Sequence, residues 1–314
     1  AQVDVLISGT QSQVALPFPV KYKFKGISFV FGKKGGVNYF QTLQKNNIFR
    51  VIKEIRKCKV KEYDMVINDF EPISAWACYF KNKVCVSLSH QGILLNKNVP
   101  KPVKKSRTGK FILKNYAPSV EKYGFHFKSY DERIYPAVIR HAVRKQKIKD
   151  KRYYTVYLPA YSDDKIIKVL SKIKGVKWKV FSKHCQKPYQ RKNVFIKPIK
   201  PNESFERSMA WSKGILCGAG FETPAEALFL KKKLMVIPMK GQYEQAYNAE
   251  SLKQLGVPIL KRLGKKQVLT IKNWIHCDTI VELNFPDQTQ AIVDKILTNH
   301  IIATELTNKV FQGL

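Results

Sequence analysis

The sequence is short of acidic residues, and it lacks paired cysteines and long apolar runs. It holds 23 Asp and Glu against 57 Lys and Arg, which gives a formal net charge of +34. Its 6 cysteines include no CxxC pair, which argues against a zinc site or a disulfide framework and favours a reducing compartment such as the cytoplasm. No apolar run reaches the roughly 18–20 residues of a membrane span, so we expect no transmembrane helix.

The cationic excess indicates a class of partner. A strongly basic surface attracts polyanions such as nucleic acid or an anionic membrane surface, and it attracts anionic small substrates. An evenly basic surface without a specific partner is the alternative explanation. Because the basic residues are spread along the chain and no DNA- or RNA-binding module is recognisable, we do not expect nucleic acid to be the partner. The charge leaves the oligomeric state open.

Short β-branched runs alternate with amphipathic stretches, which is the pattern of parallel α/β sheets. Strands are predicted at residues 3–8, 26–31, 64–69, 84–89, 154–159, 177–182, 193–198, 214–218 and 234–238, with an edge strand at 125–130. Helices are predicted at residues 38–58, 71–80, 163–174, 203–212, 223–231, 243–255 and 287–312.

The stretch 140–152 is the clearest domain boundary, because it carries seven basic residues against one aspartate and has little to bury. We therefore predict two Rossmann-like domains, over residues 1–148 and 149–286, followed by a helical tail over 287–314. The first domain opens on a strand rather than on the usual strand, Gly-rich turn and helix. We expect one β–α unit of about 30 residues to precede Ala1; a smaller first domain is the alternative.

The segment "CGAGFETPAEALFLKKKLMVIPMKGQYEQAYNAE" (217–250) places small residues where a strand gives way to a helix. Backbone N–H groups at a helix N-terminus favour anions, and glycine lets a phosphate approach the backbone closely. Thr223 either caps this helix or donates its hydroxyl to a phosphate, and Glu226 accepts from a ribose. An ordinary structural turn, with glutamates that complement the helix dipole, is the alternative. The predicted donor-binding residues of the turn, the helix and the following loop are Gly218, Ala219, Gly220, Thr223, Glu226, Gln242, Glu244, Gln245 and Asn248.

Residues 214–258 resemble the donor-binding segment of the GT-B glycosyltransferases. That family includes the UDP-glycosyltransferases and the bacterial N-acetylglucosaminyltransferase that completes lipid II. The resemblance implies that Gly220 and Thr223 contact the diphosphate of a nucleotide sugar, Glu226 the ribose and Gln245 the sugar. The sequence differs from the plant enzymes of this family, because Gly218 stands where they have a histidine and because Lys232 and Leu234 replace the usual Gly and Pro.

The resemblance extends more weakly over nearly the whole chain. It implies that the hydroxyl of Ser162 faces a phosphate and that the backbone near Ile199 reads the base. The pairs "NDFEP" (68–72) and "SHQ" (89–91) are similar to an "SDFEP…SHQ" pattern in a bacterial subfamily of GT-B proteins.

An inverting sugar transfer needs a base for the acceptor hydroxyl and stabilisation for the leaving diphosphate. The family uses helix N-termini for the latter, and we interpret Asp163–Asp164 as a helix cap rather than as part of a metal site. We therefore expect no metal and no cofactor. Asp69 resembles the carboxylate that orients the family's catalytic histidine; it either does so or caps the helix near Pro72, with Glu71 as the alternative carboxylate. His90 is a candidate base or acceptor contact, or a structural histidine.

The Lys-rich segment 101–114 either docks on a membrane or an acceptor, or packs its three apolar residues inward as a solvated helix. Together these features predict a glycosyltransferase that moves a sugar from a nucleotide sugar, expected to be a UDP-sugar, to a lipid-linked or envelope glycan at the inner membrane face. A nucleotide-sugar 2-epimerase of the same fold and a non-catalytic polyanion-binding protein are the alternatives.

Overall fold

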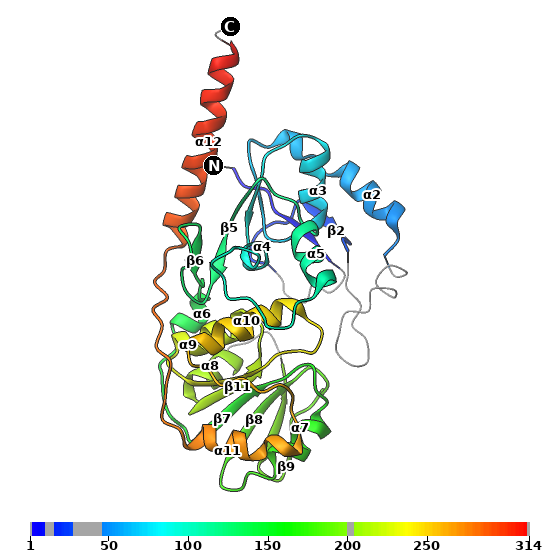
Figure 1. Cartoon of the computed structure of the whole chain (residues 1–314). Coiled ribbons are helices and arrows are strands. Elements are labelled where there is room, and N and C mark those ends of the chain that lie inside the picture. Colours follow the sequence, from blue (N-terminus) through cyan, green and yellow to red (C-terminus); the bar gives the residue numbers. More distant parts are fainter. Residues whose placement is uncertain (1, 10–15, 28–45, 200–203, 313–314) are drawn as a thin grey trace.

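The computed structural model describes residues 2–9, 16–27, 46–199 and 204–312. Figure 1 shows an upper lobe formed by the first half of the chain and a lower lobe formed by the second, with the long helix α12 returning from the lower lobe along the upper one. No described helix has both the length and the apolar character needed to cross a bilayer.

The upper lobe contains two parallel sheets. A small sheet pairs β1 (Leu6–Ser8) with β2 (Tyr22–Phe24). A larger sheet has four strands in chain order: β3 (Val66–Asn68), β4 (Cys85–Leu88), β5 (Glu121–His126) and β6 (Ile134–Pro136). Because all neighbours in the larger sheet are parallel, the carboxyl ends of β3, β4 and β5 lie at one edge, where open α/β sheets bind ligands.

The lower lobe is built on one six-stranded sheet. Its order is β12 (Lys233–Ile237), β11 (Gly214–Gly218), β7 (Tyr153–Tyr157), β8 (Lys177–Ser182), β10 (Val194–Pro198) and β9 (Tyr189–Arg191). Only β9 is antiparallel to its neighbour. Successive side chains of β11 enter different apolar clusters, since Ile215 packs with α8 and α9 on one face and Leu216 with α7 and α11 on the other. Burial on both faces explains why β11 is an uninterrupted apolar run.

The helices connect these strands and cover the sheets. The upper lobe has α2 (Ile48–Lys57), α3 (Pro72–Phe80), α4 (His90–Ile93) and α5 (Arg107–Asn115). Helix α6 (His141–Arg144) follows β6 in the chain and packs on the lower lobe, because Val143 is buried in the same apolar cluster as Met209. The lower lobe has α7 (Asp163–Leu170), α8 (Ser204–Trp211), α9 (Glu222–Phe229), α10 (Tyr243–Gln254) and α11 (Val268–His276), and α12 (Thr289–Gln312) follows. Short 3-10 turns occupy Val60–Glu62 and Lys265–Gln267.

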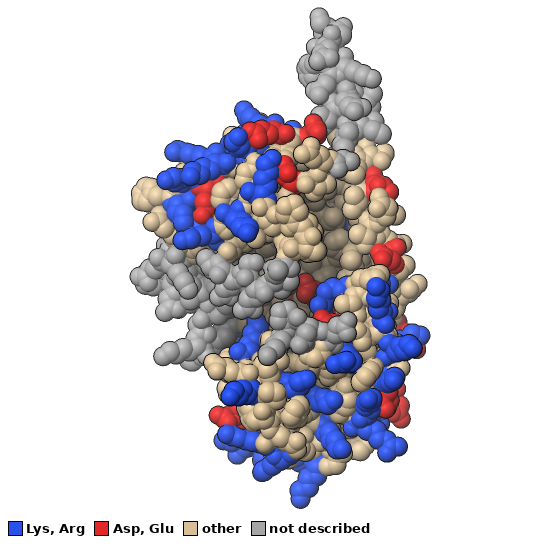
Figure 2. Space-filling model, turned by 180° about the vertical axis from the view of Figure 1, so that it is seen from behind, with Lys and Arg blue, Asp and Glu red and all other residues tan. Residues whose placement is uncertain are grey.

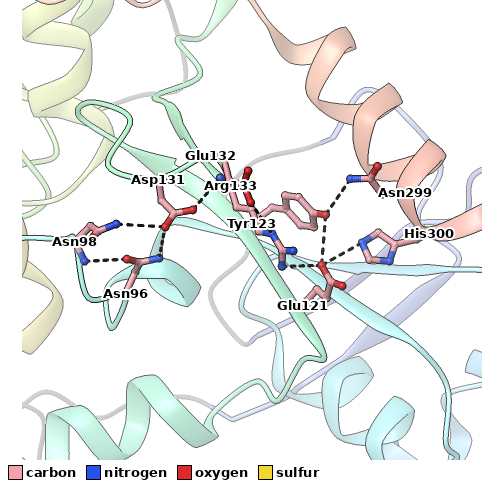
Figure 3. Close-up of polar contacts among 9 residues, drawn as sticks. All are labelled: Asn96, Asn98, Glu121, Tyr123, Asp131, Glu132, Arg133, Asn299 and His300. Carbon is pink, nitrogen blue, oxygen red and sulfur yellow. Dashed lines mark hydrogen bonds and ion pairs between the residues drawn. The ribbon is translucent and has the colours of Figure 1, made fainter. Parts of the chain in front are cut away.

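Helix α12 docks on the upper-lobe sheet. Ile292 and Ile296 are buried in one apolar cluster with Val86 and Tyr123. Figure 3 shows the polar edge of this contact, where Asn299 donates to the Tyr123 hydroxyl at 3.3 Å. The tail therefore ties the end of the chain to the first half.

Most predicted elements are confirmed, with some corrections. Residues 125–130 were expected to form an edge strand, but β5 is shifted towards the N-terminus and lies between β4 and β6 because β6 forms the edge. Most of the predicted strand 26–31 and residues 38–45 of the predicted helix 38–58 lie outside the described residues; the described helix begins at Ile48, and Asn47 caps it. In the segment 101–114, Leu113 is buried while Phe111 is exposed, so the solvated-helix alternative holds only in part. The sequence pattern missed the strands β2, β6 and β9, which have only three residues each and are too short to show an alternation. It also missed the four-residue helices α4 and α6, and α11.

Candidate active site

A cavity of about 440 Å³ lies where the carboxyl ends of the upper-lobe strands meet the first turns of α9 and α10. It is called the acidic cavity here, because three carboxylates line it and no Lys or Arg side chain does so among the described residues. Its lining residues are Asp69, His90, Gln91, Phe125, Val138, Gly220, Phe221, Glu222, Thr223 and Glu244. The cavity thus unites both predicted catalytic residues with three of the predicted donor-binding residues.

The turn between β11 and α9 presents backbone to the cavity. A Cβ built on Gly220 would meet no described atom within 4 Å, so protein packing does not require a glycine there. Thr223 lies in the first turn of α9, and no side chain caps this helix in the described part of the chain. The suggestion that Thr223 is the cap is therefore wrong, because the N-cap position belongs to Phe221. The free N–H groups of this turn favour an anion.

Asp69 follows β3 and is exposed to the acidic cavity. Glu71, and not Asp69, caps α3: its carboxylate accepts from the backbone N–H groups of Ile73 and Ser74, each at 2.7 Å. No hydrogen bond or ion pair of the Asp69 carboxylate is seen within the described ranges. The cavity walls raise the pKa of Asp69 by desolvation, and Glu222 adds to this by charge repulsion. A carboxylate with a raised pKa and no partner is suited to accept a proton.

His90 is buried, and both of its ring nitrogens are engaged. Nδ1 lies 2.8 Å from the carbonyl oxygen of Phe125, and Nε2 lies 2.8 Å from Oδ1 of Asn248. Asn248 in turn donates to the carbonyl of Ala219 at 3.1 Å, and the imidazole stacks on the ring of Phe221 at 3.8 Å. Burial lowers the pKa of His90, against the opposing effect of Glu244. In this arrangement His90 joins the two lobes and holds the 219–221 turn, and neither nitrogen is available to a substrate.

Glu226 lies behind the cavity rather than in its wall. Its side chain is 3% exposed, and its two oxygens accept from Nε and Nη2 of Arg140 at 2.6 and 3.0 Å. Nη1 of Arg140 also donates to Glu206 at 2.9 Å. The hydrogen bond with Glu226 raises the pKa of Arg140, so the guanidinium is charged. The sequence analysis missed Arg140, because it stands in a stretch that resembles a solvated linker.

The remaining predicted residues do not line the cavity. Ser162 is exposed at the start of α7, and Ile199 is half-buried at the end of β10. Gln242 precedes α10, Oε1 of Gln245 accepts from the backbone of Met239 at 2.8 Å, and Asn248 and Ala219 are fully buried. Gly218 lies at the end of β11, next to Gln245. Asp163 is not the cap of α7, because its carboxylate accepts from Ser182 and Tyr189 instead.

Several lining residues were not predicted. Glu222 and Phe221 lie within the segment 217–250. Glu222 was not singled out, because an acidic residue in the first turn of a helix is usually explained by its favourable interaction with the helix dipole. Gln91 donates to Glu244 at 3.5 Å, across 153 positions of sequence, which no local pattern reveals. Within the described residues, no three His, Cys, Asp or Glu side chains are grouped to hold a metal ion.

The comparisons with known proteins agree with this architecture. The model of the family described as "Glycosyl transferase family 1" matches residues 2–275. CalG4, the calicheamicin glycosyltransferase, is 11% identical, with 93% of this chain and 87% of that chain covered at a TM-score of 0.52. The glycotransferase of kitacinnamycin is 10% identical, with 92% and 86% covered at a TM-score of 0.51. MurG of Acinetobacter baumannii is 12% identical, with 82% and 77% covered at a TM-score of 0.48. No curated protein matches the sequence. The predicted GT-B fold, with two Rossmann-like parts, is confirmed.

Proposed function

Because the chain belongs to glycosyl transferase family 1, we propose that the acidic cavity transfers a sugar from a nucleotide sugar, a UDP-sugar, to a hydroxyl of a lipid-linked or envelope glycan at the inner membrane face. The observation that supports this is the composition of the cavity. Asp69, from the upper lobe, lines the same space as Gly220 and Thr223, from the lower lobe. A base and an anion-binding turn are the two parts that such a transfer needs.

The lower lobe holds the donor in this proposal. The diphosphate lies against the first turn of α9, where Gly220 leaves room and the hydroxyl of Thr223 donates. Glu222 and Glu244 accept hydrogen bonds from sugar hydroxyls, because they are the carboxylates that border this turn. Contact between Glu226 and the ribose requires Arg140 to give up at least one of its two hydrogen bonds to that carboxylate.

The transfer is a single displacement with inversion. The acceptor oxygen bonds to the anomeric carbon of the sugar as the bond from that carbon to the diphosphate oxygen breaks. The proton of the acceptor hydroxyl passes to Asp69, and the nucleoside diphosphate leaves with the electron pair. His90 positions the 219–221 turn through Asn248 instead of taking the proton, since both ring nitrogens are occupied.

The reaction needs no metal in this proposal, since the charge that develops on the leaving group meets the N–H groups of the α9 turn. Turnover measured with and without excess EDTA tests this directly. A loss of turnover that Mg²⁺ or Mn²⁺ restores contradicts it.

Donor binding and turnover together test the proposed function. A panel of nucleoside diphosphates and nucleotide sugars is added to the wild type, and the melting temperature is followed, because a ligand that binds only the folded state raises it. Asp69→Asn retains this shift but lowers turnover by about 10²–10⁴-fold, the usual contribution of a general base. Asp64→Asn, an exposed carboxylate on the same segment, serves as the matched control.

Three outcomes contradict the proposal. No nucleotide shifts the melting temperature, or Asp69→Asn and Asp64→Asn have equal turnover, or the donor is converted to an epimer without any acceptor. The last result identifies a nucleotide-sugar epimerase. Salt-sensitive binding to duplex nucleic acid without nucleotide binding identifies a polyanion-binding protein.

A further inference from the structure

We propose that a second cavity, on the other side of the α10 N-terminus, binds phosphate groups of the acceptor. This inference rests on the proposed function and names the chemical class of its acceptor. The cavity has a volume of about 910 Å³ and is called the basic cavity here. Its lining residues are Lys104, Lys105, Ser106, Ala160, Tyr161, Pro238, Met239, Lys240, Gly241, Gln242, Tyr243, Ala246, Lys261 and Arg262.

The charge of the basic cavity is of one sign. Five of its lining residues are Lys or Arg, and no Asp or Glu lines it among the residues that the structure describes. Over the same residues, no ion pair or hydrogen bond is seen for any of these five charged groups. Neighbouring cations repel one another, so an unpaired group of this kind favours a bound anion.

The basic cavity is not simply a sample of a uniformly basic surface. Figure 2 shows Lys and Arg side chains over much of one face of the molecule, with acidic side chains scattered among them. Yet the acidic cavity, which is lined by the same first turn of α10, has three carboxylates and no Lys or Arg among the described residues. Gln242 and Tyr243 face the basic cavity and Glu244 faces the acidic one, so consecutive residues separate two spaces of opposite charge.

The cationic segments are held in place by the fold. In the upper lobe, Ser106 caps α5 by accepting from Gly109 at 3.0 Å, and this fixes the end of the loop with Lys104 and Lys105. A Cβ on Gly109 would lie 2.5 Å from the ring of Tyr243, so the glycine lets α5 approach α10. In the lower lobe, the Tyr161 hydroxyl accepts from the backbone of Leu263 at 3.0 Å, next to Arg262.

Phosphate is the anion that these groups suit. Lysine ammonium groups bind it as point charges, and an arginine guanidinium binds two of its oxygens at once. Ala160, Pro238, Met239 and Ala246 form apolar wall between the cations, which suits the sugar or lipid part of the same molecule. A group held here is adjacent to Glu244 and therefore to the cavity of Asp69, whereas the donor diphosphate occupies the α9 turn on the other side.

Binding of inorganic pyrophosphate tests the inference. Calorimetric titrations are run at 150 mM salt to screen long-range attraction, with saturating UDP present so that the donor site is filled. Two double variants, Lys104→Glu with Lys105→Glu and Lys261→Glu with Arg262→Glu, each replace two of the five cations with carboxylates, the first pair in the upper lobe and the second in the lower lobe. The control, called the α7 variant here, is Lys168→Glu with Lys172→Glu, at exposed lysines on α7 and in the turn that follows it; it gives the same change in net charge away from the basic cavity. Circular dichroism and melting confirm that each variant folds.

Both cavity variants are expected to weaken pyrophosphate binding at least about tenfold, which corresponds to roughly 1.4 kcal/mol, while the α7 variant changes it less than about twofold. Equal weakening in the α7 variant assigns the binding to net charge and overturns the proposal. So does loss of UDP binding in the cavity variants, which would make the basic cavity part of the donor site. If the wild type binds pyrophosphate but no nucleotide, the proposed function fails and the anion site stands.

Vesicle sedimentation identifies the source of the phosphate. If the cavity variants bind phosphatidylglycerol vesicles no better than phosphatidylcholine vesicles, and the α7 variant still binds them, the phosphate belongs to a lipid headgroup. If vesicle binding is unchanged while pyrophosphate binding is lost, the acceptor is a soluble phosphorylated glycan. Binding of pyrophosphate that all variants retain overturns the site for either source.

Discussion

Arg140 pairs with two buried carboxylates of the lower lobe, and replacing it with methionine tests whether this pairing stabilises the fold. The side chains of Glu226 and Glu206 are 3% and 11% exposed, and Arg140 is 51% exposed. Arg140→Met keeps much of the length of the side chain but leaves both carboxylates without the guanidinium. Breaking a buried pair in this way costs about 3–5 kcal/mol, and because half of Arg140 faces solvent we expect about 3 kcal/mol, the lower end of that range.

The loss is measurable as a lower melting temperature. For a domain of 150–250 residues, about 3 kcal/mol corresponds to a decrease of roughly 6–12 °C. Arg191→Met is the matched control, because Arg191 pairs with Asp164 at 2.9 Å but both side chains are exposed, 62% and 83%. Exposed pairs of that kind contribute about 0–1 kcal/mol.

The double variant Arg140→Met with Glu226→Gln provides the sharper comparison, since an amide is easier to bury than an unpaired carboxylate. It should melt above Arg140→Met alone. The destabilisation should depend on pH. Burial raises the pKa of Glu226 and Arg140 opposes this, so without Arg140 the folded state binds a proton at Glu226 more tightly than the unfolded state does. The decrease in melting temperature of Arg140→Met should therefore be smaller at pH 5 than at pH 8. The reasoning is refuted if the melting temperature of Arg140→Met falls no further than that of Arg191→Met, or if the double variant does not melt above Arg140→Met.

Three further predictions follow from the site. Gly220→Ala should leave the melting temperature unchanged while it weakens nucleoside diphosphate binding, whereas Gly124→Ala, whose Cβ would collide with the carbonyl of Ser89, should destabilise the protein; equal effects on melting contradict the assignment of Gly220 to the ligand. Asn248→Ala removes the hydrogen-bond partner of Nε2 of His90 and of the Ala219 carbonyl. An unsatisfied buried group costs about 1–3 kcal/mol, so this variant should have a lower melting temperature and slower turnover. Normal turnover would show that the 219–221 turn does not depend on Asn248. Turnover of the wild type should rise with pH through a pKa above the ordinary range of an aspartate, because Asp69 acts as a base only when deprotonated. If Asp69→Glu shows the same pH profile with the same midpoint, the titrating group is not residue 69.

The sequence alone determined most of the longer strands and helices and their order, and the turn at the ligand-binding edge of the lower lobe. Residues 177–182 and 214–218 were predicted as strands and form β8 and β11 with those bounds. In β11 the signal is a continuous apolar run, because this strand is buried on both faces. The predicted domain bounds and the individual roles of the site residues stay predictions.

Only the tertiary structure decided which side chains meet. Arg140 reaches Glu226 over 86 positions, and His90 reaches Asn248 over 158. A local pattern carries no information about such partners, because they depend on which elements the folded sheets bring to one edge. The same holds for charge: the sequence shows an excess of +34, but the separation of an acidic cavity from a basic one arises where residues 242–244 pass between them. Local motifs in the sequence therefore indicate which residues carry the chemistry, while the packing of the two lobes decides how these residues are arranged into a site.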